Sequence, residues 1–217
     1  LTKFIEELDS TFYELDPEFL ITMAVPTSNW SGQWYDFSSL RPHVDFFNAM
    51  TYDIHGGWTS HAGHNSPLYS SPVGDPDGSC ETGINYLANT RGIPSSQINL
   101  GLPFWGKQYN ASDINMSFTG NVVDKLYKEI PNLIDNGWSY EWDNIAYAPY
   151  LKKDDQSKII TFGQPSWRTQ RDIAGGGVLS MTLQTVIPEA YEETHDSVSI
   201  LGGVGFAVAF CAAALFD

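Results

Sequence analysis

The sequence predicts an α/β fold organised around a buried strand of a parallel sheet. Residues 46–50 are mostly apolar, and period-two alternation puts Phe47, Ala49 and Thr51 on one face of the strand they form. Apolar side chains on both faces are typical of a parallel sheet that is covered on both sides. Polar residues and a Gly-rich loop follow at the C-terminal end of this strand, over residues 51–57, where an α/β barrel builds its functional site.

The other face of the strand carries candidate binding residues. Asn48, Met50 and Tyr52 share that face, and Asp53 and Trp58 come soon after them. Tyr52 offers a neutral hydroxyl donor, Asp53 a carboxylate and Trp58 a flat surface for stacking. This combination suits a neutral, hydroxylated, ring-shaped ligand such as a sugar.

Three stretches, in a fixed order, resemble one known family. Met50-x-Tyr52-Asp53 is followed by a His-Gly loop, Gly63–Tyr69 reads Gly-His-Asn-Ser-Pro-Leu-Tyr, and Ile98–Lys107 ends in Leu-Gly-Leu-Pro-Phe-Trp-Gly-Lys. They resemble the sixth strand, the loop after it and the next strand of glycoside hydrolase family 18, the chitinases. In that family the last motif usually reads Leu-Gly-Leu-Pro-Phe-Tyr-Gly-Arg.

The resemblance implies an α/β fold that is the C-terminal half, strands five to eight, of a TIM (β/α)8 barrel, with an α+β chitinase-type insertion between the last two strands. The expected parallel strands are residues 19–25, 46–52, 98–103 and 176–182. The expected parts are barrel strands and helices over 1–105, an α+β insertion subdomain over 106–170, the last barrel strand and helix over 171–196, and an apolar tail over 197–217.

Local patterns predict the other elements. Apolar residues near helical spacing predict a helix over 1–15, and Ser79 as N-cap with Gly92 as the stop predicts another over 81–91. The remaining expectations are a short helical connection over 37–43, a helix over 121–130, and short strands over 138–150 and 158–162.

The resemblance also implies a substrate and a mechanism. The substrate class is β-1,4-linked N-acetylglucosamine polymers such as chitin, cleaved by a retaining mechanism in which the substrate's own acetamido oxygen attacks the anomeric carbon. Tyr52 would donate a hydrogen bond to that acetamido group, and Asp53 would hydrogen-bond in the same subsite. The implied substrate-binding residues are Met50, Trp58, Trp105 and Met181, of which Met181 stands where the family keeps a Trp.

One part of that mechanism is missing from the sequence. The family's general acid is a Glu at the end of Asp-x-x-Asp-x-Asp-x-Glu on strand four, and no Asp-x-Asp-x-Glu occurs here. We therefore expect strands one to four, with the acid, to lie before Leu1, and residues 1–217 alone to be inactive. Two alternatives stay open: a non-catalytic glycan-binding relative, which Met181 and the Lys107-for-Arg replacement would suit, and a membrane-anchored structural protein.

Net charge and cysteine and histidine content limit the classes of partner and cofactor that we expect. The chain of 217 residues carries a formal net charge of −15 and has a pI near 4.4, which argues against nucleic acid and anionic membrane surfaces. With only Cys80 and Cys211, no disulfide framework is inferred. No cofactor is expected. For His55, His61 and His64 we favour hydrogen bonding within the loop over a metal site, because regular ligand spacing is lacking.

Two apolar features leave a choice of interpretation. Residues 198–216 carry no charge and as a helix would span roughly 28 Å, so we favour a membrane-inserting tail over a buried helix. For Trp30 and Trp34 we favour packing against the barrel rim over sugar stacking. The implied substrate predicts an extracellular or cell-surface location, with the apolar tail as a candidate membrane anchor.

Overall fold

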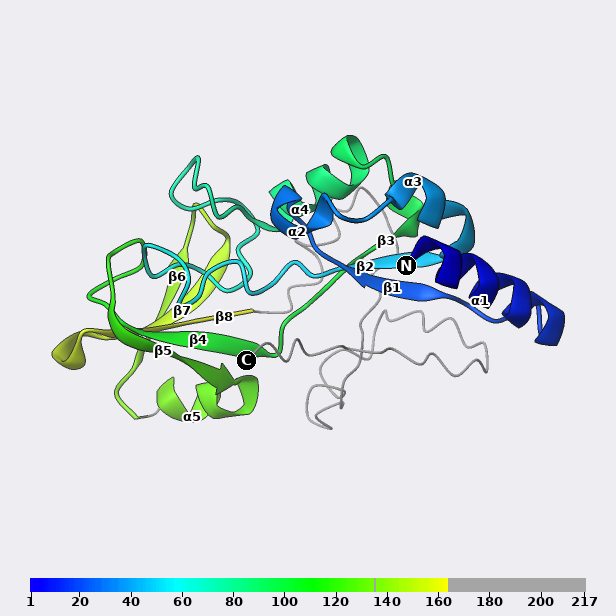
Figure 1. Ribbon diagram of the computed structural model, residues 1–217. Coiled ribbons are helices and arrows are strands. Elements are labelled where there is room, and N and C mark those ends of the chain that lie inside the picture. Colours follow the sequence, from blue (N-terminus) through cyan, green and yellow to red (C-terminus); the bar gives the residue numbers. More distant parts are fainter. Residues whose placement is uncertain (135, 164–217) are drawn as a thin grey trace.

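The computed structural model describes residues 1–134 and 136–163, and within them the chain forms two sheets side by side (Figure 1). One is a three-stranded parallel sheet with helices packed on it, and the other is a five-stranded sheet that carries a single short α-helix. The described residues do not include the expected strand 176–182, the expected parts 171–196 and 197–217, or the apolar segment 198–216. Met181 and Cys211 also lie outside them.

The parallel sheet has the order β1-β2-β3, which confirms the first three predicted parallel strands. Phe47, at the centre of β2, is in register with Met23 on one side and Ile98 on the other. All three strands are shorter than the predicted ranges. They are β1 (Thr22–Val25), β2 (Phe46–Ala49) and β3 (Ile98–Leu100).

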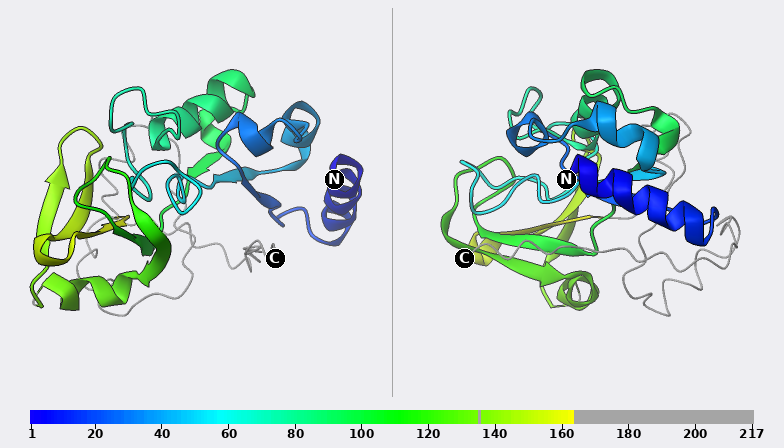
Figure 2. Two further views of the ribbon diagram at one scale, coloured as in Figure 1. Left: turned by 60° about the vertical axis from the view of Figure 1, so that its left-hand side comes forward. Right: turned by 45° about the vertical axis from the view of Figure 1, so that its right-hand side comes forward.

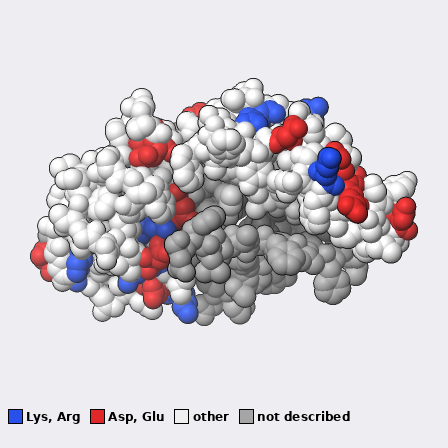
Figure 3. Space-filling view, in the orientation of Figure 1, with Lys and Arg blue, Asp and Glu red and all other residues white. Residues whose placement is uncertain are grey.

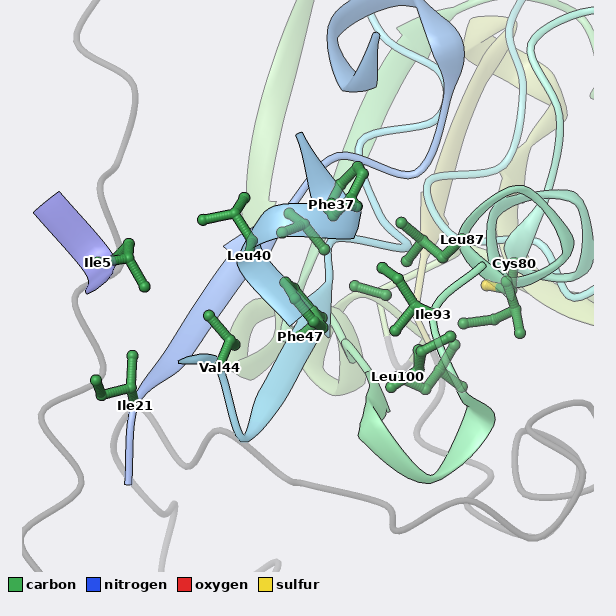
Figure 4. Close-up of a cluster of buried hydrophobic side chains, with 14 residues drawn as sticks. Ile5, Ile21, Phe37, Leu40, Val44, Phe47, Cys80, Leu87, Ile93 and Leu100 are labelled. Atoms are coloured by element: carbon green, nitrogen blue, oxygen red, sulfur yellow. The ribbon is translucent and has the colours of Figure 1, made fainter. Parts of the chain in front are cut away.

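Helices cover one face of this sheet, and their apolar side chains meet those of β2 and β3 in one core (Figure 4). Phe47 and Ala49 point into that core and are almost fully buried, whereas Asn48 and Met50 on the opposite face are half-buried. The period-two prediction for this strand is therefore confirmed. The helical elements that supply core residues here are α3 (Phe37–Leu40), α4 (Cys80–Asn85) and a π-helical turn η2 (Tyr86–Thr90). Three short helical elements, α2 (Asn29–Gly32), η1 (Arg41–His43) and η3 (Ser95–Gln97), lie in the connections between the strands.

The predicted ends of the helical segment 81–91 are confirmed. The Ser79 hydroxyl accepts from the Thr82 backbone N–H at 3.2 Å, while the Thr82 hydroxyl accepts from the Ser79 backbone N–H at 2.7 Å. This reciprocal pair is a capping box, and a cap of this kind stabilises a helix by ~1 kcal/mol. Gly92 ends the segment at a φ of 70°, a conformation that Gly adopts without a Cβ clash.

Helix α1 (Thr2–Leu15) confirms the helix predicted at the N-terminus and lies beside β1 (Figure 1). Its Ile5 joins the core, with Leu8 and Phe12 packed against it. A 2.8 Å contact between His43 Nδ1 and Asp9 Oδ2 ties the helix to η1.

Arg91 holds the segment between β1 and α3 in place. Its guanidinium donates to the carbonyl oxygens of Gly32 at 3.0 Å and Tyr35 at 2.5 Å, and lies 5.0 Å from the Phe37 ring centroid. The neighbouring Trp30 and Trp34 nevertheless remain 85% and 80% exposed. The packing that we favoured for these two Trp side chains is therefore wrong.

The second sheet is antiparallel, with the order β5-β4-β8-β7-β6. Strands β6, β7 and β8 confirm the strands expected within 138–150 and 158–162, whereas β4 was not predicted. The elements are β4 (Trp105–Asn110), β5 (Thr119–Leu126), η4 (Tyr127–Glu129), α5 (Ile130–Ile134), β6 (Ser139–Asp143), β7 (Ala148–Lys153), η5 (Asp154–Gln156) and β8 (Lys158–Phe162).

The helix predicted over 121–130 is wrong, because most of that range belongs to strand β5. Val122 and Val123 are β-branched and favour a strand. Gln108 of β4 pairs with Val123 in register, and Val122 packs against the cluster around Tyr109. Backbone pairing with β4 and this side-chain packing override the local spacing.

Residues 51–79 form a long connection without helix or strand, and it runs between the two sheets (Figures 1 and 2). Backbone hydrogen bonds fix it to two loops of the antiparallel sheet. Ala62 N–H donates to Met116 O, between β4 and β5, at 2.9 Å, and Leu68 N–H donates to Ala146 O, between β6 and β7, at 2.8 Å. In the part of the chain that is described, no helix has both the length and the apolar character needed to cross a bilayer.

Candidate functional site

The candidate site lies where β2 ends, at Tyr52 and Asp53. Asp53 has a φ of 56°, in the left-handed region that Asp tolerates better than most residues. Its backbone N–H donates to Asn65 Oδ1 at 3.2 Å, and the Asn65 amide donates to the Trp105 carbonyl at 3.1 Å. Asn65 thus fixes this turn of the chain to the first residue of β4.

The Asp53 carboxylate is held by two donors from β4. Trp105 Nε1 donates to Asp53 Oδ1 at 3.0 Å, and Lys107 Nζ lies 3.0 Å from the same oxygen. Trp105 and Lys107 are two residues apart on one strand and project to the same side of it. The carboxylate therefore bridges the parallel sheet to the antiparallel one.

Lys107 also binds Asp124 of β5, with 2.7 Å between Nζ and Oδ1. Burial of Lys107 favours its neutral form, but the hydrogen bonds to Asp124 and Asp53 outweigh this and raise the pKa of its ammonium group. Lys107 is consequently a fixed positive charge within the site at neutral pH. Figure 3 shows acidic and basic side chains together in small groups on the face that it draws.

Tyr52 forms an apolar wall next to this ion pair. Its ring meets the Trp105 ring edge to face, with centroids 4.9 Å apart. Gly101 permits the close approach, since a Cβ at residue 101 would lie 2.5 Å from the Ala49 carbonyl oxygen and 2.8 Å from a Tyr52 ring carbon. Thr51 adds a hydrogen bond to the Gly101 carbonyl at 2.8 Å.

Trp58 supplies the exposed surface of the site. Its side chain is 66% exposed, and Lys107 Nζ lies 5.5 Å from the centroid of its ring. Met50 is half-buried on the Asn48 face of the β2 segment. The structure thus brings Tyr52, Asp53, Trp58 and Trp105 together around Lys107, whereas predicted Met181 lies outside the described residues.

Sequence reasoning missed three residues of this arrangement. Lys107 was noted only as a replacement for Arg, and the contacts of Asn65 and Asp124 were not anticipated. Recognising the strand 105–110 would have placed Trp105 and Lys107 on one side of it, because side chains alternate along a strand. Nothing in the sequence pattern of Asn65 or Asp124 points to their partners.

A buried pair of polar residues supports the loop behind the site. His64 Nε2 lies 3.0 Å from Asp143 Oδ2, and the Ser71 hydroxyl donates to the same oxygen at 2.8 Å. Burial lowers the pKa of His64, and the hydrogen bond to Asp143 only partly opposes this. Burial alone would raise the pKa of Asp143, but the donors His64 and Ser71 and the backbone N–H groups of Ile145 and Ala146 hold it well below its usual range.

A second group gathers His55, His61, Asp75 and Asp77. One ligand atom from each lies within 4.8 Å of those of the others. His55 Nε2 is 3.0 Å and His61 Nε2 is 3.2 Å from Asp75 Oδ2. The hydrogen-bonding contacts predicted for the loop histidines are present, and the set also has donor atoms that suit a metal ion.

Replacing Gly101 by Ala should destabilise the fold by ~1–3 kcal/mol, because the new methyl group must displace the Ala49 carbonyl or the Tyr52 ring. Urea unfolding of the two proteins measures this difference. The matched control is Gly57→Ala, whose Cβ would meet nothing closer than Val122 at 3.8 Å and should change stability by less than ~0.5 kcal/mol. Equal costs for the two variants would contradict the close packing of Tyr52.

Replacing Lys107 by Gln should cost ~1–3 kcal/mol of unfolding free energy near neutral pH, because two carboxylates lose a buried charged donor. The folded-state pKa of Lys107 lies above its usual value of 10.5, so this contribution is fully present below pH 10.5 and is lost as pH rises through the folded-state pKa. Urea unfolding of both proteins across alkaline pH measures it. The control Lys152→Gln breaks the ion pair of a more exposed lysine with a single carboxylate, Asp113, and should cost no more than ~1 kcal/mol; a larger loss there would refute this account.

The chain is similar in sequence to curated proteins of two kinds. It is 29% identical over 163 residues to the oviduct-specific glycoprotein of Papio anubis, which covers 67% of this chain and 26% of that protein. It is 27% identical over 177 residues to the endochitinase of Manduca sexta, covering 70% of this chain and 32% of that one. The chain thus spans about a quarter to a third of the length of these relatives.

Solved chitinase structures share the fold. The Ostrinia furnacalis Group IV chitinase superposes with a TM-score of 0.70 at 23% identity, over 82% of this chain and 54% of that chain. The class V chitinase of Nicotiana tobaccum gives a TM-score of 0.70 at 20% identity, over 82% and 56%. The likeness to these TIM-barrel-type chitinases extends over about half of their length.

The model of the family described as glycosyl hydrolases family 18 matches residues 1–171, which is most of the chain. The match includes all three motifs that carried the resemblance. This chain belongs to glycosyl hydrolases family 18.

Proposed function

We propose that this chain provides the acetamido-binding side of a chitinase-type sugar site and binds β-1,4-linked N-acetylglucosamine oligomers. The observation that carries the proposal is the Asp53 carboxylate, held by Trp105 and Lys107 beside the Tyr52 ring. Family membership supports the choice of ligand. So do solved chitinase structures of the same fold that hold allosamidin or N-acetylglucosamine oligomers.

The geometry suits an acetamido group. Among the described residues, the side-chain contacts of Asp53 all use Oδ1, so its Oδ2 can accept a hydrogen bond from the N–H of a bound sugar. The Tyr52 and Trp105 rings offer an apolar wall for the methyl group, and the Tyr52 hydroxyl would donate to the acetamido oxygen. Trp58, exposed at the margin of the site, would stack on a neighbouring sugar ring.

The proposal extends to the fold and the parts of the chain. Strands β1, β2 and β3 would correspond to barrel strands five, six and seven, supported by the order of the motifs along the chain. The change from a parallel to an antiparallel sheet between β3 and β4 supports an insertion that starts near residue 106. The last barrel strand within 171–196, with Met181, and a membrane-inserting tail within 197–217 remain proposals from the sequence.

Hydrolysis by a substrate-assisted retaining mechanism is the activity we propose for a protein that combines this side of the site with a general acid. Residues 1–217 contain no Asp-x-Asp-x-Glu motif to supply that acid. An extracellular or cell-surface location would match the substrate.

A non-catalytic glycan-binding protein is the second candidate. It is favoured by Lys107, which stands where the family usually has Arg. Lys binds as a compact point charge and lacks the planar set of donors that Arg provides. In this chain it binds two carboxylates, Asp53 and Asp124, at once.

Titration calorimetry with N-acetylchitotriose tests the binding proposal. Trp58→Ala should weaken binding about 2- to 12-fold, from the loss of ~0.5–1.5 kcal/mol of stacking. Tyr52→Phe should weaken it by a similar factor through one lost hydrogen bond. The control Tyr13→Ala removes an exposed ring from α1 and should leave affinity unchanged.

The same preparations should release no product from a chromogenic chitobioside, because a missing general acid alone costs about two to four orders of magnitude in rate. Affinity that is unaffected by both Trp58→Ala and Tyr52→Phe would reject this binding site. Clear turnover by residues 1–217 would show that the chain contains a catalytic acid that the family pattern does not reveal.

A further inference from the structure

We propose that His55, His61, Asp75 and Asp77 form a binding site for a divalent transition-metal ion of the zinc class. Nothing in the sugar-binding proposal assigns a metal to this loop, and neither proposal depends on the other. The irregular spacing of these residues along the chain does not by itself predict a metal site. In the folded chain, however, the four side chains converge.

The separations between the four ligand atoms fit one small ion. Zinc bonds of about 2.0–2.2 Å to nitrogen and oxygen, arranged tetrahedrally, put neighbouring ligand atoms about 3.4 Å apart. The His55 Nε2 to Asp75 Oδ2, His61 Nε2 to Asp75 Oδ2 and His55 Nε2 to Asp77 Oδ2 separations are 3.0, 3.2 and 3.7 Å. All four ligand atoms lie within 4.8 Å of one another, so small side-chain rotations complete the site.

The hydrogen bonding of His55 is the second and independent observation. Its Nδ1 lies 2.9 Å from the His64 carbonyl oxygen, which can only accept, so Nδ1 must carry the proton. Its Nε2, on the opposite edge of the ring, lies 3.0 Å from the carboxylate of Asp75. Nε2 is therefore the His55 nitrogen that faces the other candidate ligands. Donation of the second ring N–H to a backbone carbonyl is also the usual arrangement of a metal-binding His.

The site is fixed on one side and accessible on the other. The side chains of His55 and Asp75 are 1% and 0% exposed, and Gly63 packs so tightly on the His55 ring that any Cβ there would collide with it. Asp77 is 30% exposed, which leaves an entry path for an ion. Two imidazoles and two carboxylates suit zinc and its neighbours, whereas magnesium and calcium prefer an all-oxygen set.

The role of the ion would be to close the long loop. His55 and His61 lie near one end of the connection 51–79, and Asp75 and Asp77 lie near the other. Between them lies Asn65, which binds the Asp53 backbone. An ion here would therefore stabilise the loop whose position sets Asp53, without touching the sugar.

The test is calorimetric titration of Zn²⁺ into the chelator-treated chain, together with the visible absorption of the Co²⁺ form. The wild-type chain should bind a single equivalent, and Zn²⁺ should raise its thermal unfolding midpoint. Loss of a residue that only hydrogen-bonds to a metal ligand weakens metal binding roughly 10- to 100-fold. Because His61 and Asp77 would bind the ion directly, His61→Gln and Asp77→Asn should each weaken Zn²⁺ binding by at least that factor. Both replaced side chains are partly exposed, so these variants should fold.

The matched control is His43→Gln, which removes a His from a different His–Asp pair, with Asp9, and should not change Zn²⁺ affinity. Equal binding by wild type, His61→Gln and Asp77→Asn would place the ion elsewhere and overturn the proposal. So would an absence of Zn²⁺ binding by the wild-type chain, because the four converging ligand atoms are the whole basis of the proposal.

Discussion

The site depends on the contacts of the Asp53 carboxylate with Trp105 and Lys107, because they join the end of β2 in the parallel sheet to β4 in the antiparallel sheet. The left-handed backbone of Asp53 costs ~1–2 kcal/mol. Hydrogen bonds to a charged group are worth ~1.5–3 kcal/mol each, and Asp53 Oδ1 receives two of them, from Trp105 and Lys107. The contacts therefore outweigh the strain, and they orient Tyr52 next to the apolar edge of Trp105.

The long connection after Asp53 extends the same logic into the loop. Asn65 holds the Asp53 backbone and the Trp105 carbonyl together, and the neighbouring His64 is anchored to Asp143 on β6. The Nδ1 atom of His64 is buried and has no hydrogen-bond partner within the described ranges, which agrees with a neutral ring. His55 differs, since both of its ring nitrogens face acceptors. His55 and His64, two histidines of one loop, thus make different sets of contacts.

The sequence predicted the three described parallel strands and the residues at the end of β2 because those features are local. Alternation along 46–52 separates a core face from a site face, and the motif places Tyr52 and Asp53 directly after it. The strand β5 could not be recognised in this way, since its pairing partner β4 decides its conformation. The exposure of Trp30 and Trp34 was missed because a Trp carries no sign of whether a loop turns it inward.

The contacts that complete the site are long-range, and for that reason they escaped prediction. Lys107 reaches Asp53 across 54 positions of the chain and Asp124 across the β4–β5 pair. His55 and Asp75 are brought together by a connection with no regular period. Residue type alone indicated candidate ligands there, and only the folded loop shows that they converge.

Saturation-transfer NMR with N-acetylchitotriose tests the central claim most directly, by irradiating aromatic protons of the protein and observing the sugar. If the acetamido group lies against Tyr52 and Trp105 with its N–H on Asp53, its methyl protons should receive the largest share of the transferred saturation. That share should fall in an Asp53→Ala variant. Transfer spread evenly over the sugar protons, or unchanged in that variant, would contradict the site described here.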